Sequence, residues 1–406
     1  MLDAKFIREK TGEVKKILKL RKLPTKVLDD WLNKDKEFRE LKGKLDSLRH
    51  QRNVVSQEIS ELTKEGKKPK DKFQKAKEIS QKIKKSQENM GEIEKELKEL
   101  TLHFPNQIDK KVGLKEKIIE TKGKPKKEKY QKDYLELTKK WLDLDRAAKI
   151  SGEGFILLKG DLATLQRALI NFCLDTCIKN KYQEAYLPVM LNQNSVTNSG
   201  HYPKFVDGMY QTKDGFYLSP TEEVAILNMY AGKTLNGKEL PINLTAFTPS
   251  FRTEKGATKG MFRIHQFDEV EVFKITKPKD SEKELKIMLS DALTPIKLLG
   301  LPYRVKLLAG WDLPNQCSIT YDIEVFSPKS GWLELSSCSN CTDYQARRAR
   351  IYFEEKGERK LVHTLNGTCV GINRLMIAIL ENFQQKDGSI KIPAVLHKYT
   401  GKKVIK

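Results

Sequence analysis

Apolar residues in the first quarter of the chain recur at spacings of three and four, the period of one helix face. Between residues 30 and 63 they are Phe38, Leu41, Leu45, Leu48, Val55, Ile59 and Leu62. After Gly66 and Pro69 a heptad register resumes with Ala76, Ile79, Ile83, Met90, Ile93, Leu97 and Leu100. The pattern predicts an antiparallel coiled-coil hairpin over about residues 30–101, whose first helix would reach roughly 50 Å at about 1.5 Å per residue.

The tip of this predicted hairpin is strongly basic. Its lysines are Lys64, Lys67, Lys68, Lys70, Lys72, Lys75, Lys77, Lys82, Lys84 and Lys85, set against Glu65, Asp71 and Glu78. A hairpin this thin buries little apolar surface, so its length indicates a role outside its own stability. Two interpretations stay open on this stretch alone: a lever that reaches an extended nucleic acid, and a dimerisation or scaffold arm.

Residues 248–276, TPSFRTEKGATKGMFRIHQFDEVEVFKIT, alternate apolar and polar positions at both ends, with two glycines between. We predict an antiparallel hairpin with a basic loop over residues 255–260. A period of two places Arg252 and Glu254 on one face of the first strand, and the second strand presents Arg263, His265, Phe267, Glu269 and Glu271 on one face. Guanidinium groups suit phosphates, an aromatic ring stacks on a base, and a carboxylate receives an ammonium group. The alternative is a solvated face of mixed charges.

The order F-R-x-E, glycine-bearing loop, R-x-H-Q-F, three residues and Glu resembles motif 2 of class II aminoacyl-tRNA synthetases. Its ending, R-x-H-Q-F-x-x-V-E, resembles the seryl-tRNA synthetase family. Further likenesses are the T-x-E triplet that begins at Thr221, the E-x-S-S element from Glu334 to Ser337, motif 1 over residues 162–188, and motif 3 in HTLNGTCVGINRLMIAIL. Two departures are a shorter loop between Glu254 and Arg263, and Glu153-Gly154 before Phe155.

The resemblance implies an α+β fold, in which an antiparallel class II sheet flanked by helices follows an amino-terminal coiled-coil arm. It divides the chain into a tRNA-binding domain over residues 1–105, a linker over 106–133 and a catalytic domain over 134–406. It also implies a homodimer, with motif 1 as the dimer element.

The implied activity is that of a serine-tRNA ligase, which activates L-serine with ATP to seryl-adenylate and transfers serine to tRNA(Ser), with tRNA(Sec) as a further candidate. Arg252, Arg263 and Arg374 would act on the phosphates, Phe267 would stack on adenine, Glu254 would accept from its amino group, and Glu334 with Ser337 would hold Mg²⁺ and ATP. The serine site would comprise Thr221, Glu223, Arg252, Glu271, Asn366 and Thr368. Lys67, Lys68 and Lys70 are candidate tRNA contacts.

The sequence around Arg374 indicates an anion-binding role independently of the family resemblance. Arg374 opens the segment 375–383, which is apolar nearly all round and predicts a buried helix. A permanent charge at a buried helix start needs an anion, and a phosphate also suits the helix dipole there. An internal salt bridge is the alternative.

Composition indicates the class of partner, the cellular compartment and the state of the cysteines. The chain has 76 Lys and Arg against 54 Asp and Glu, a formal charge of +22, which favours a polyanionic partner over a mere lysine bias. The start MLDAKFIREK has no apolar signal core, and the aliphatic run 375–380 is too short to cross a bilayer, so we expect a cytoplasmic protein without membrane association. The six cysteines predict reduced thiols, and the C-x-x-C of Cys338 and Cys341 lacks the partners of a zinc site.

Two other functions remain as alternatives. A non-catalytic paralogue that only binds RNA would lack a phosphate-binding arginine, and none is missing. A structural coiled-coil protein would continue its heptads beyond the first quarter of the chain, and none continue.

Overall fold

The computed structural model describes residues 1–253 and 260–406. Contacts between Cα atoms divide the chain into two compact units. One is Leu2–Phe104, and the other is Pro105–Lys406 together with Met1.

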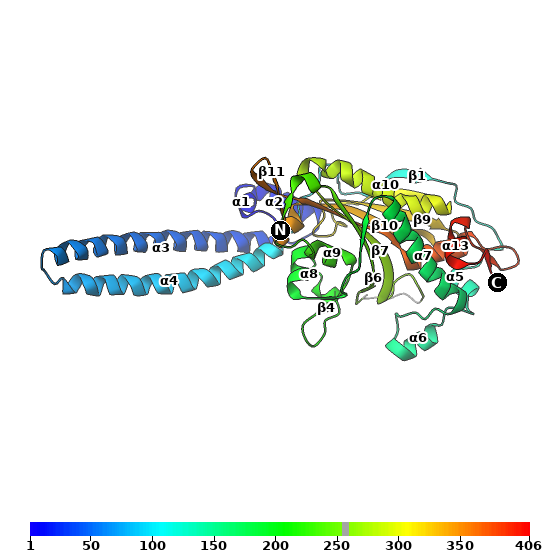
Figure 1. Ribbon diagram of the computed structural model, residues 1–406, viewed down its shortest axis with the longest axis horizontal. Helices are drawn as coiled ribbons and strands as arrows, with labels where there is room; N and C mark the ends of the chain where they lie inside the picture. Colours follow the sequence, from blue (N-terminus) through cyan, green and yellow to red (C-terminus); the bar gives the residue numbers. More distant parts are fainter. Residues whose placement is uncertain (254–259) are drawn as a thin grey trace. The chain divides into compact units, whose positions relative to one another are not determined.

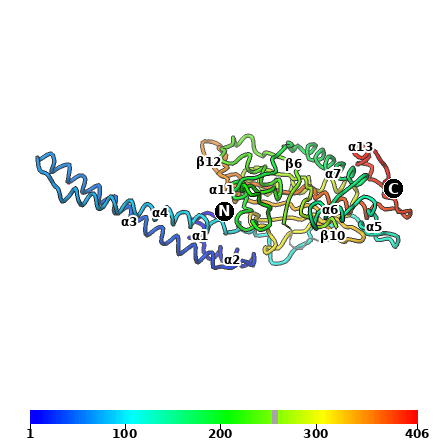
Figure 2. Tube along the Cα trace, turned by 90° about the horizontal axis from the view of Figure 1, so that it is seen from below, coloured from blue at the N-terminus to red at the C-terminus, as the bar shows by residue number. Residues whose placement is uncertain are grey.

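The unit Leu2–Phe104 is entirely helical in its regular elements. Two short helices, α1 (Ala4–Glu9) and α2 (Thr11–Leu20), precede two long ones, α3 (Lys26–Lys64) and α4 (Lys70–Leu102). Helices α3 and α4 lie side by side and run in opposite directions (Figure 1 and Figure 2). Predicted core residues from both helices, Leu45, Val55, Ile79 and Ile83, pack in one buried cluster. The coiled-coil hairpin is therefore confirmed.

A compact cluster at the base of the hairpin holds its two ends together. Trp31 is fully buried there, meets Phe104 edge-on and donates from Nε1 to Thr101 Oγ1 at 2.8 Å. Asp35 is also buried and accepts hydrogen bonds from Arg8 and Arg39. Burial alone would raise the pKa of Asp35, but the two guanidinium groups outweigh it and lower the pKa.

The larger unit is built on an eight-stranded sheet in the order β1-β8-β9-β10-β13-β7-β6-β2. Its strands are β1 (Lys117–Lys122), β2 (Gln183–Ala185), β6 (Ile242–Phe251), β7 (Gln266–Thr276), β8 (Tyr303–Leu307), β9 (Ile319–Ser327), β10 (Gly331–Thr342) and β13 (His363–Gly371). Every neighbouring pair is antiparallel except β2 and β6. The predicted α+β fold with an antiparallel sheet is confirmed.

Three helices cover one face of the sheet: α7 (Gly160–Lys179), α10 (Ser281–Leu299) and α12 (Ile372–Asn382). Strand β7 turns Val270 and Val272 into this core and Glu269 and Glu271 to the other face, as its period of two requires. Helix α12 buries all residues from 375 to 380. Within the described residues, no helix is both long and apolar enough to cross a membrane.

The remaining elements are short. The helices are α5 (Tyr134–Thr138), α6 (Leu144–Ser151), α8 (Gln193–Ser199), α9 (Glu222–Asn228), α11 (Tyr344–Ala349) and α13 (His397–Thr400), with single 3-10 turns η1 (Val206–Gly208), η2 (Gly237–Glu239), η3 (Pro278–Asp280) and η4 (Ala394–Leu396). The strands are β3 (Met190–Leu191), β4 (Tyr217–Leu218), β5 (Thr234–Asn236), β11 (Tyr352–Glu355), β12 (Glu358–Leu361), β14 (Ile390–Lys391) and β15 (Val404–Ile405).

Two details differ from the sequence-based expectation. The segment treated as a linker contains β1, which pairs with β8 at the edge of the large sheet. The predicted second strand of the hairpin begins only at Gln266, so Arg263 and His265 lie before it. The reason is visible in the burial, because Met261 and Ile264 are both buried, a spacing of three that an alternating strand does not give. The predicted loop, apart from Gly260, lies outside the described residues.

The carboxylate of Glu381 offers a test of this packing. It is fully buried in the last turn of α12 and accepts five hydrogen bonds: from Tyr134 N, Ser327 Oγ, Lys329 N, Ser330 N and Ser330 Oγ. Glu381→Gln turns an amide N–H towards these donors, so we expect the free energy of unfolding to fall by about 3 kcal/mol in urea denaturation. Glu358→Gln, at an exposed ion pair with Lys360, is the control and should change it by less than about 0.5 kcal/mol. Equal losses would contradict the assigned role of Glu381.

Candidate active site

A cavity of about 630 Å³ opens on the sheet face opposite α7 and α10. Six stretches that are distant in sequence form its walls: the segment after α8, the start of α9, the β6–β7 connection with β7, the segment before β9, the strand β10, and β13 with the start of α12. The predicted site residues in its lining are Thr221, Glu223, Arg252, Arg263, Phe267, Glu271, Glu334, Ser337, Asn366, Thr368 and Arg374. The fold thus brings these predicted residues to one place.

Four predicted residues are not in this lining. Glu254 lies outside the described residues. Lys67 and Lys68 occupy the turn between α3 and α4, and Lys70 begins α4, so all three belong to the helical unit and are exposed. Their proposed role is separate from the chemistry of the cavity.

Arg252 is held by three neighbours on one side of the cavity. Its Nε donates to the carbonyl oxygen of Pro220 at 2.9 Å, and its guanidinium carbon lies 4.9 Å from the centre of the Phe267 ring. Its Nη2 is 3.8 Å from Glu269 Oε1. A planar cation stacked on an aromatic ring and tethered at one nitrogen keeps a fixed orientation, which suits bidentate contact with an oxyanion.

Arg374 belongs to the same cavity lining and lies where α12 begins. Its Nη1 donates to the Glu334 carbonyl oxygen at 2.9 Å and lies 3.7 Å from Glu334 Oε2, while its Nε donates to the Phe262 carbonyl oxygen at 3.3 Å. The internal salt bridge considered from the sequence is therefore present. Both side chains are partly exposed, at 32% for Arg374 and 51% for Glu334, so this pair is weak enough to rearrange around an anion.

Two buried carboxyl groups occupy the deeper end of the cavity. Glu271 accepts from Asn366 Nδ2 at 2.7 Å and from Thr368 Oγ1 at 3.3 Å. Glu223 accepts from Gln345 Nε2. Burial raises the pKa of Glu271 well above its usual range, and burial raises the pKa of Glu223 to about 7 against the opposing hydrogen bonds. Such carboxyl groups favour a cationic ligand, whose charge restores their ionised form.

Oxygen donors gather where β10 and β9 pair. Ser337 lies opposite Asp322 in the strand pairing, and the charge of Glu334 acts on the Asp322 carboxyl group. Burial, followed by the charge of Glu334, raises the pKa of Asp322 to about 8. Glu334, Ser337 and Asp322 are hard oxygen donors, the ligand type that Mg²⁺ requires, so these residues fit that ion.

The two cysteines of the C-x-x-C motif, Cys338 and Cys341, do not share a common partner. All six cysteines are free and buried. Cys341 lies with its Sγ 3.8 Å from that of Cys317, whereas Cys338 contacts Ser336. The pair in the motif therefore points to different partners, because successive odd and even positions of β10 face opposite ways.

Sequence reasoning missed three residues that shape the deeper end of the cavity. Gln345 on α11 fixes Glu223 and also accepts from Thr364 Oγ1 at 2.7 Å. Glu222 and Glu269 place two further carboxyl groups beside Glu271. A signal existed for Glu269, because it shares a strand face with Phe267 and Glu271. Gln345 opens a Q-x-R-R stretch that resembles the family, but the sequence assigns it no role in the site.

Comparisons with known proteins agree along the whole chain. Residues 1–108 match the model of the seryl-tRNA synthetase N-terminal domain, and residues 206–383 match that of the tRNA synthetase class II core domain (G, H, P, S and T). The serine-tRNA ligase of Methanosarcina barkeri is 39% identical over 414 residues, covering 99% of this chain and 97% of that protein. That of Chloroherpeton thalassium is 40% identical over 426 residues, covering 100% of both.

Solved structures give the same result. The seryl-tRNA synthetase from Pyrococcus horikoshii complexed with ATP has a TM-score of 0.95 and 33% identity, covering 100% of this chain and 99% of that one. The cytoplasmic serine-tRNA ligase from Naegleria fowleri in complex with AMP has a TM-score of 0.87 and 28% identity, with the same coverage.

Proposed function

The chain belongs to the seryl-tRNA synthetase family of class II serine-tRNA ligases, and on that premise we propose how its cavity performs the reaction. The enzyme activates L-serine with ATP to seryl-adenylate, releasing pyrophosphate, and transfers serine to tRNA(Ser). The observation that carries the proposal is the convergence of the predicted residues from four distant segments on one cavity.

ATP occupies the wall formed by the arginines. Arg252 neutralises the α-phosphate as charge develops on it, and Arg263 with Arg374 holds the γ-phosphate end. Adenine stacks on Phe267, whose ring Arg252 already covers at 4.9 Å, and Glu254 accepts from the adenine amino group. The ion pair of Arg374 with Glu334 opens when the phosphates arrive, which frees both groups for new partners.

Glu334 and Ser337 hold Mg²⁺, with Asp322 beside Ser337. When bound, the ion supplies positive charge that offsets the charge on the phosphate oxygens. The three side chains are supplied by paired strands, so their positions are set by the sheet rather than by a loop.

Serine occupies the deeper end. Glu271 receives its ammonium group, and Glu223 with Thr221, Asn366 and Thr368 completes the pocket around the ammonium and hydroxyl groups. The serine carboxylate attacks the α-phosphorus directly. No general base is needed, because that carboxylate is already an anion, so the protein acts by positioning and charge neutralisation.

The domain roles follow from the same family membership. Residues 1–105 form the tRNA-binding domain with the arm at about 30–101, residues 106–133 connect it, and residues 134–406 form the catalytic domain. Lys67, Lys68 and Lys70 contact RNA phosphates, and the formal charge of +22 supports a polyanionic partner. The tRNA(Sec) substrate remains a further candidate.

We also propose a homodimer in the cytoplasm. The motif 1 segment supports the dimer, because Tyr186 is 97% exposed directly after the edge strand β2, and Ile178 is 45% exposed nearby in the chain. Six free, buried thiols support a reducing compartment. The two alternatives from the sequence find no support, since the long helices end at Leu102 and three arginines line the cavity.

The direct test is serine-dependent exchange of pyrophosphate into ATP, and Arg252→Lys sharpens it. We expect the adenylation rate to fall on the order of a hundredfold, about 3 kcal/mol, with a smaller change in KM for serine, because a point charge cannot reproduce the guanidinium fork. Lys398→Arg, an exposed substitution far along the chain, is a control that should keep the parental rate. Parental adenylation by Arg252→Lys would remove the α-phosphate assignment.

Serine binding should depend on pH through Glu223. Its folded-state pKa of about 7 means that the ionised carboxylate is lost as pH falls through 7, so KM for serine should rise between pH 8 and pH 6. Glu223→Gln should raise KM at pH 8 and make this dependence less steep. Pyrophosphate exchange at saturating ATP measures both. An unaltered slope in the variant would assign the titration to another group.

The arm is tested by deleting residues 30–101 and joining the ends with a short glycine-rich linker. No residue assigned to ATP or serine lies before Thr221, so seryl-adenylate formation should persist, while aminoacylation should collapse. An arm that serves only as a dimer strut would instead change the sedimentation of the protein and spare its affinity for tRNA. Charge reversal at Lys67, Lys68 and Lys70 should flatten the salt dependence of tRNA binding, by roughly one unit of slope for each RNA phosphate that a lysine no longer binds.

A further inference from the structure

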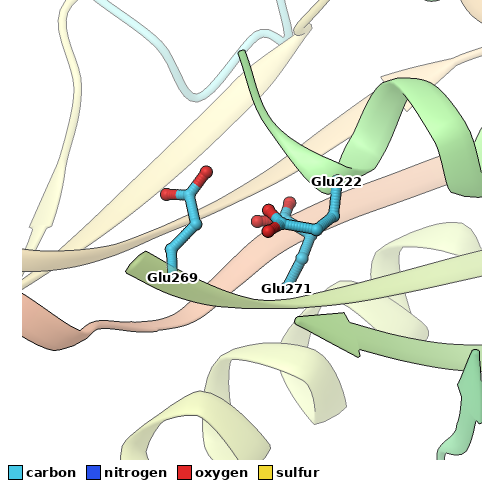
Figure 3. Close-up of side chains that lie close together, drawn as sticks. All are labelled: Glu222, Glu269 and Glu271. Atoms are coloured by element: carbon cyan, nitrogen blue, oxygen red, sulfur yellow. The ribbon is translucent and has the colours of Figure 1, made fainter. Parts of the chain in front are cut away.

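Three buried carboxyl groups converge beside the serine site (Figure 3). Glu222 is the first residue of α9, and Glu269 and Glu271 are two apart on β7. Within the part of the chain that the structure describes, they are the one set of three His, Cys, Asp or Glu residues whose ligand atoms all lie within 4.8 Å of one another. They are 0%, 6% and 1% exposed. Three negative charges this close in a dry interior require protons or a cation.

The hydrogen-bond donors around these groups are unevenly distributed. Glu271 is served at both oxygens by Asn366 and Thr368, and Glu269 accepts from Ser250 Oγ at 3.3 Å and faces Arg252. Glu222 Oε1 accepts from Thr248 N at 2.7 Å and from Thr248 Oγ1 at 2.8 Å.

The other oxygen of Glu222 is different. Glu222 Oε2 is buried and receives no hydrogen bond from any donor of the described residues. An unpartnered oxygen in a fully buried carboxylate would carry a large desolvation penalty. The same side chain nevertheless has the carboxyl group of Glu269 beside it, with a ligand oxygen of each group within 4.8 Å of the other.

These two observations have one chemical solution. Two carboxyl oxygens can hydrogen-bond only if one of them carries a proton. Because two donors from Thr248 converge on Glu222 Oε1, that oxygen is the carbonyl, and Oε2 is the hydroxyl. We propose that Glu222 is a carboxylic acid at neutral pH whose Oε2–H donates to Glu269, so that a buried proton rather than a metal ion neutralises this side of the serine site.

The surrounding charges place the proton on Glu222 rather than on Glu269. Burial, followed by the charge of Glu269, raises the pKa of Glu222 well above its usual range. Burial also raises the pKa of Glu269, but Arg252 opposes that shift. The elements packed against α9 fit this assignment: β7 presents Glu269 and Glu271, whereas β6 meets Glu222 with the neutral Thr248, and α8 meets the helix with the neutral Asn198.

The proton makes Glu222 a positioning residue for both substrates. The ionised Glu269 remains directed at Arg252 and keeps that guanidinium stacked on Phe267 until a phosphate replaces the carboxylate. Glu271 then remains as the group that ionises when an ammonium ligand arrives. This last step rests on the proposed function, whereas the protonation of Glu222 does not.

Glu222→Gln tests the proposal on the substrate-free protein, because glutamine copies the acid form without titrating. Its Oε1 accepts from Thr248 and its Nε2 donates to Glu269. Urea denaturation of the parent and the variant is measured from pH 5 to pH 8.5 in the presence of a chelator.

The expected direction of the pH dependence follows from the number of protons that Glu222 binds in the folded and in the unfolded state. The unfolded chain ionises Glu222 above about pH 4.3, whereas the folded protein keeps its proton up to a raised pKa. The stability of the parent relative to the variant therefore falls as pH rises, by about a factor of ten in the unfolding constant per pH unit. Glu358→Gln, which alters an exposed carboxylate, should give a constant difference from the parent over this range.

A constant difference between the parent and Glu222→Gln would overturn the proposal, since Glu222 would then be ionised in the folded protein. It would also be overturned if Mg²⁺ or Ca²⁺ raised the urea midpoint of the parent and not of the variant, which would identify a cation site. Neither result bears on pyrophosphate exchange, so the proposed function would stand.

If Glu222→Gln does not fold, infrared spectroscopy of the parent protein provides a second test. With serine, Mg²⁺ and a non-hydrolysable ATP analogue bound, the cationic partners ionise Glu271 and Asp322, and we expect a carboxylic acid C=O band from the parent protein to persist at pH 8. The disappearance of every such band at pH 8 would also overturn the assignment.

Discussion

Burial of carboxyl groups against an antiparallel sheet is the constraint on which the catalytic unit depends. Strand β7 sends Val270 and Val272 into the apolar core and Glu269 and Glu271 to the opposite face. Glu269 and Glu271 are nearly as buried as these valines, so each carboxyl group needs a donor, a cation or a proton. The hydrogen-bond donors are Asn366, Thr368 and Gln345, and the cation is Arg252. The proton is the one proposed on Glu222.

The same constraint explains why the side chains are fixed at the proposed serine end of the site and looser at the proposed phosphate end. Glu223 and Glu271 are fixed by amide and hydroxyl donors that are themselves buried or half-buried. Arg374 and Glu334, in contrast, form a partly exposed pair that can exchange partners at little energetic expense. A selective pocket for a small amino acid needs fixed side chains, and a site that binds and releases phosphates needs side chains that can change partners.

The helical unit is stabilised by other contacts than the catalytic unit. Its long hairpin is closed by a narrow seam of apolar side chains and by a compact cluster around Trp31, and it presents lysines at its turn. Each helix satisfies its own backbone hydrogen bonds, so the packing of this seam and of the base cluster is what holds the pair together. The hairpin can therefore serve as an extended surface for a polyanion without taking part in the chemistry of the cavity.

The sequence by itself determined the elements whose signal is periodic. Heptads specified the hairpin, alternation specified the two faces of β7, and motif spacing identified Arg252, Phe267, Glu271, Glu334 and Arg374 as residues that would meet. Tertiary structure decided the rest. The departure from strand geometry at Arg263 arises because Met261 and Ile264 are both drawn into the core, and β1 forms only because β8 offers it an edge. The hydrogen bond of Gln345 to Glu223 and the closeness of Glu222 to Glu269 join residues 122 and 47 positions apart in the sequence, and no local pattern encodes an encounter between buried side chains at such separations.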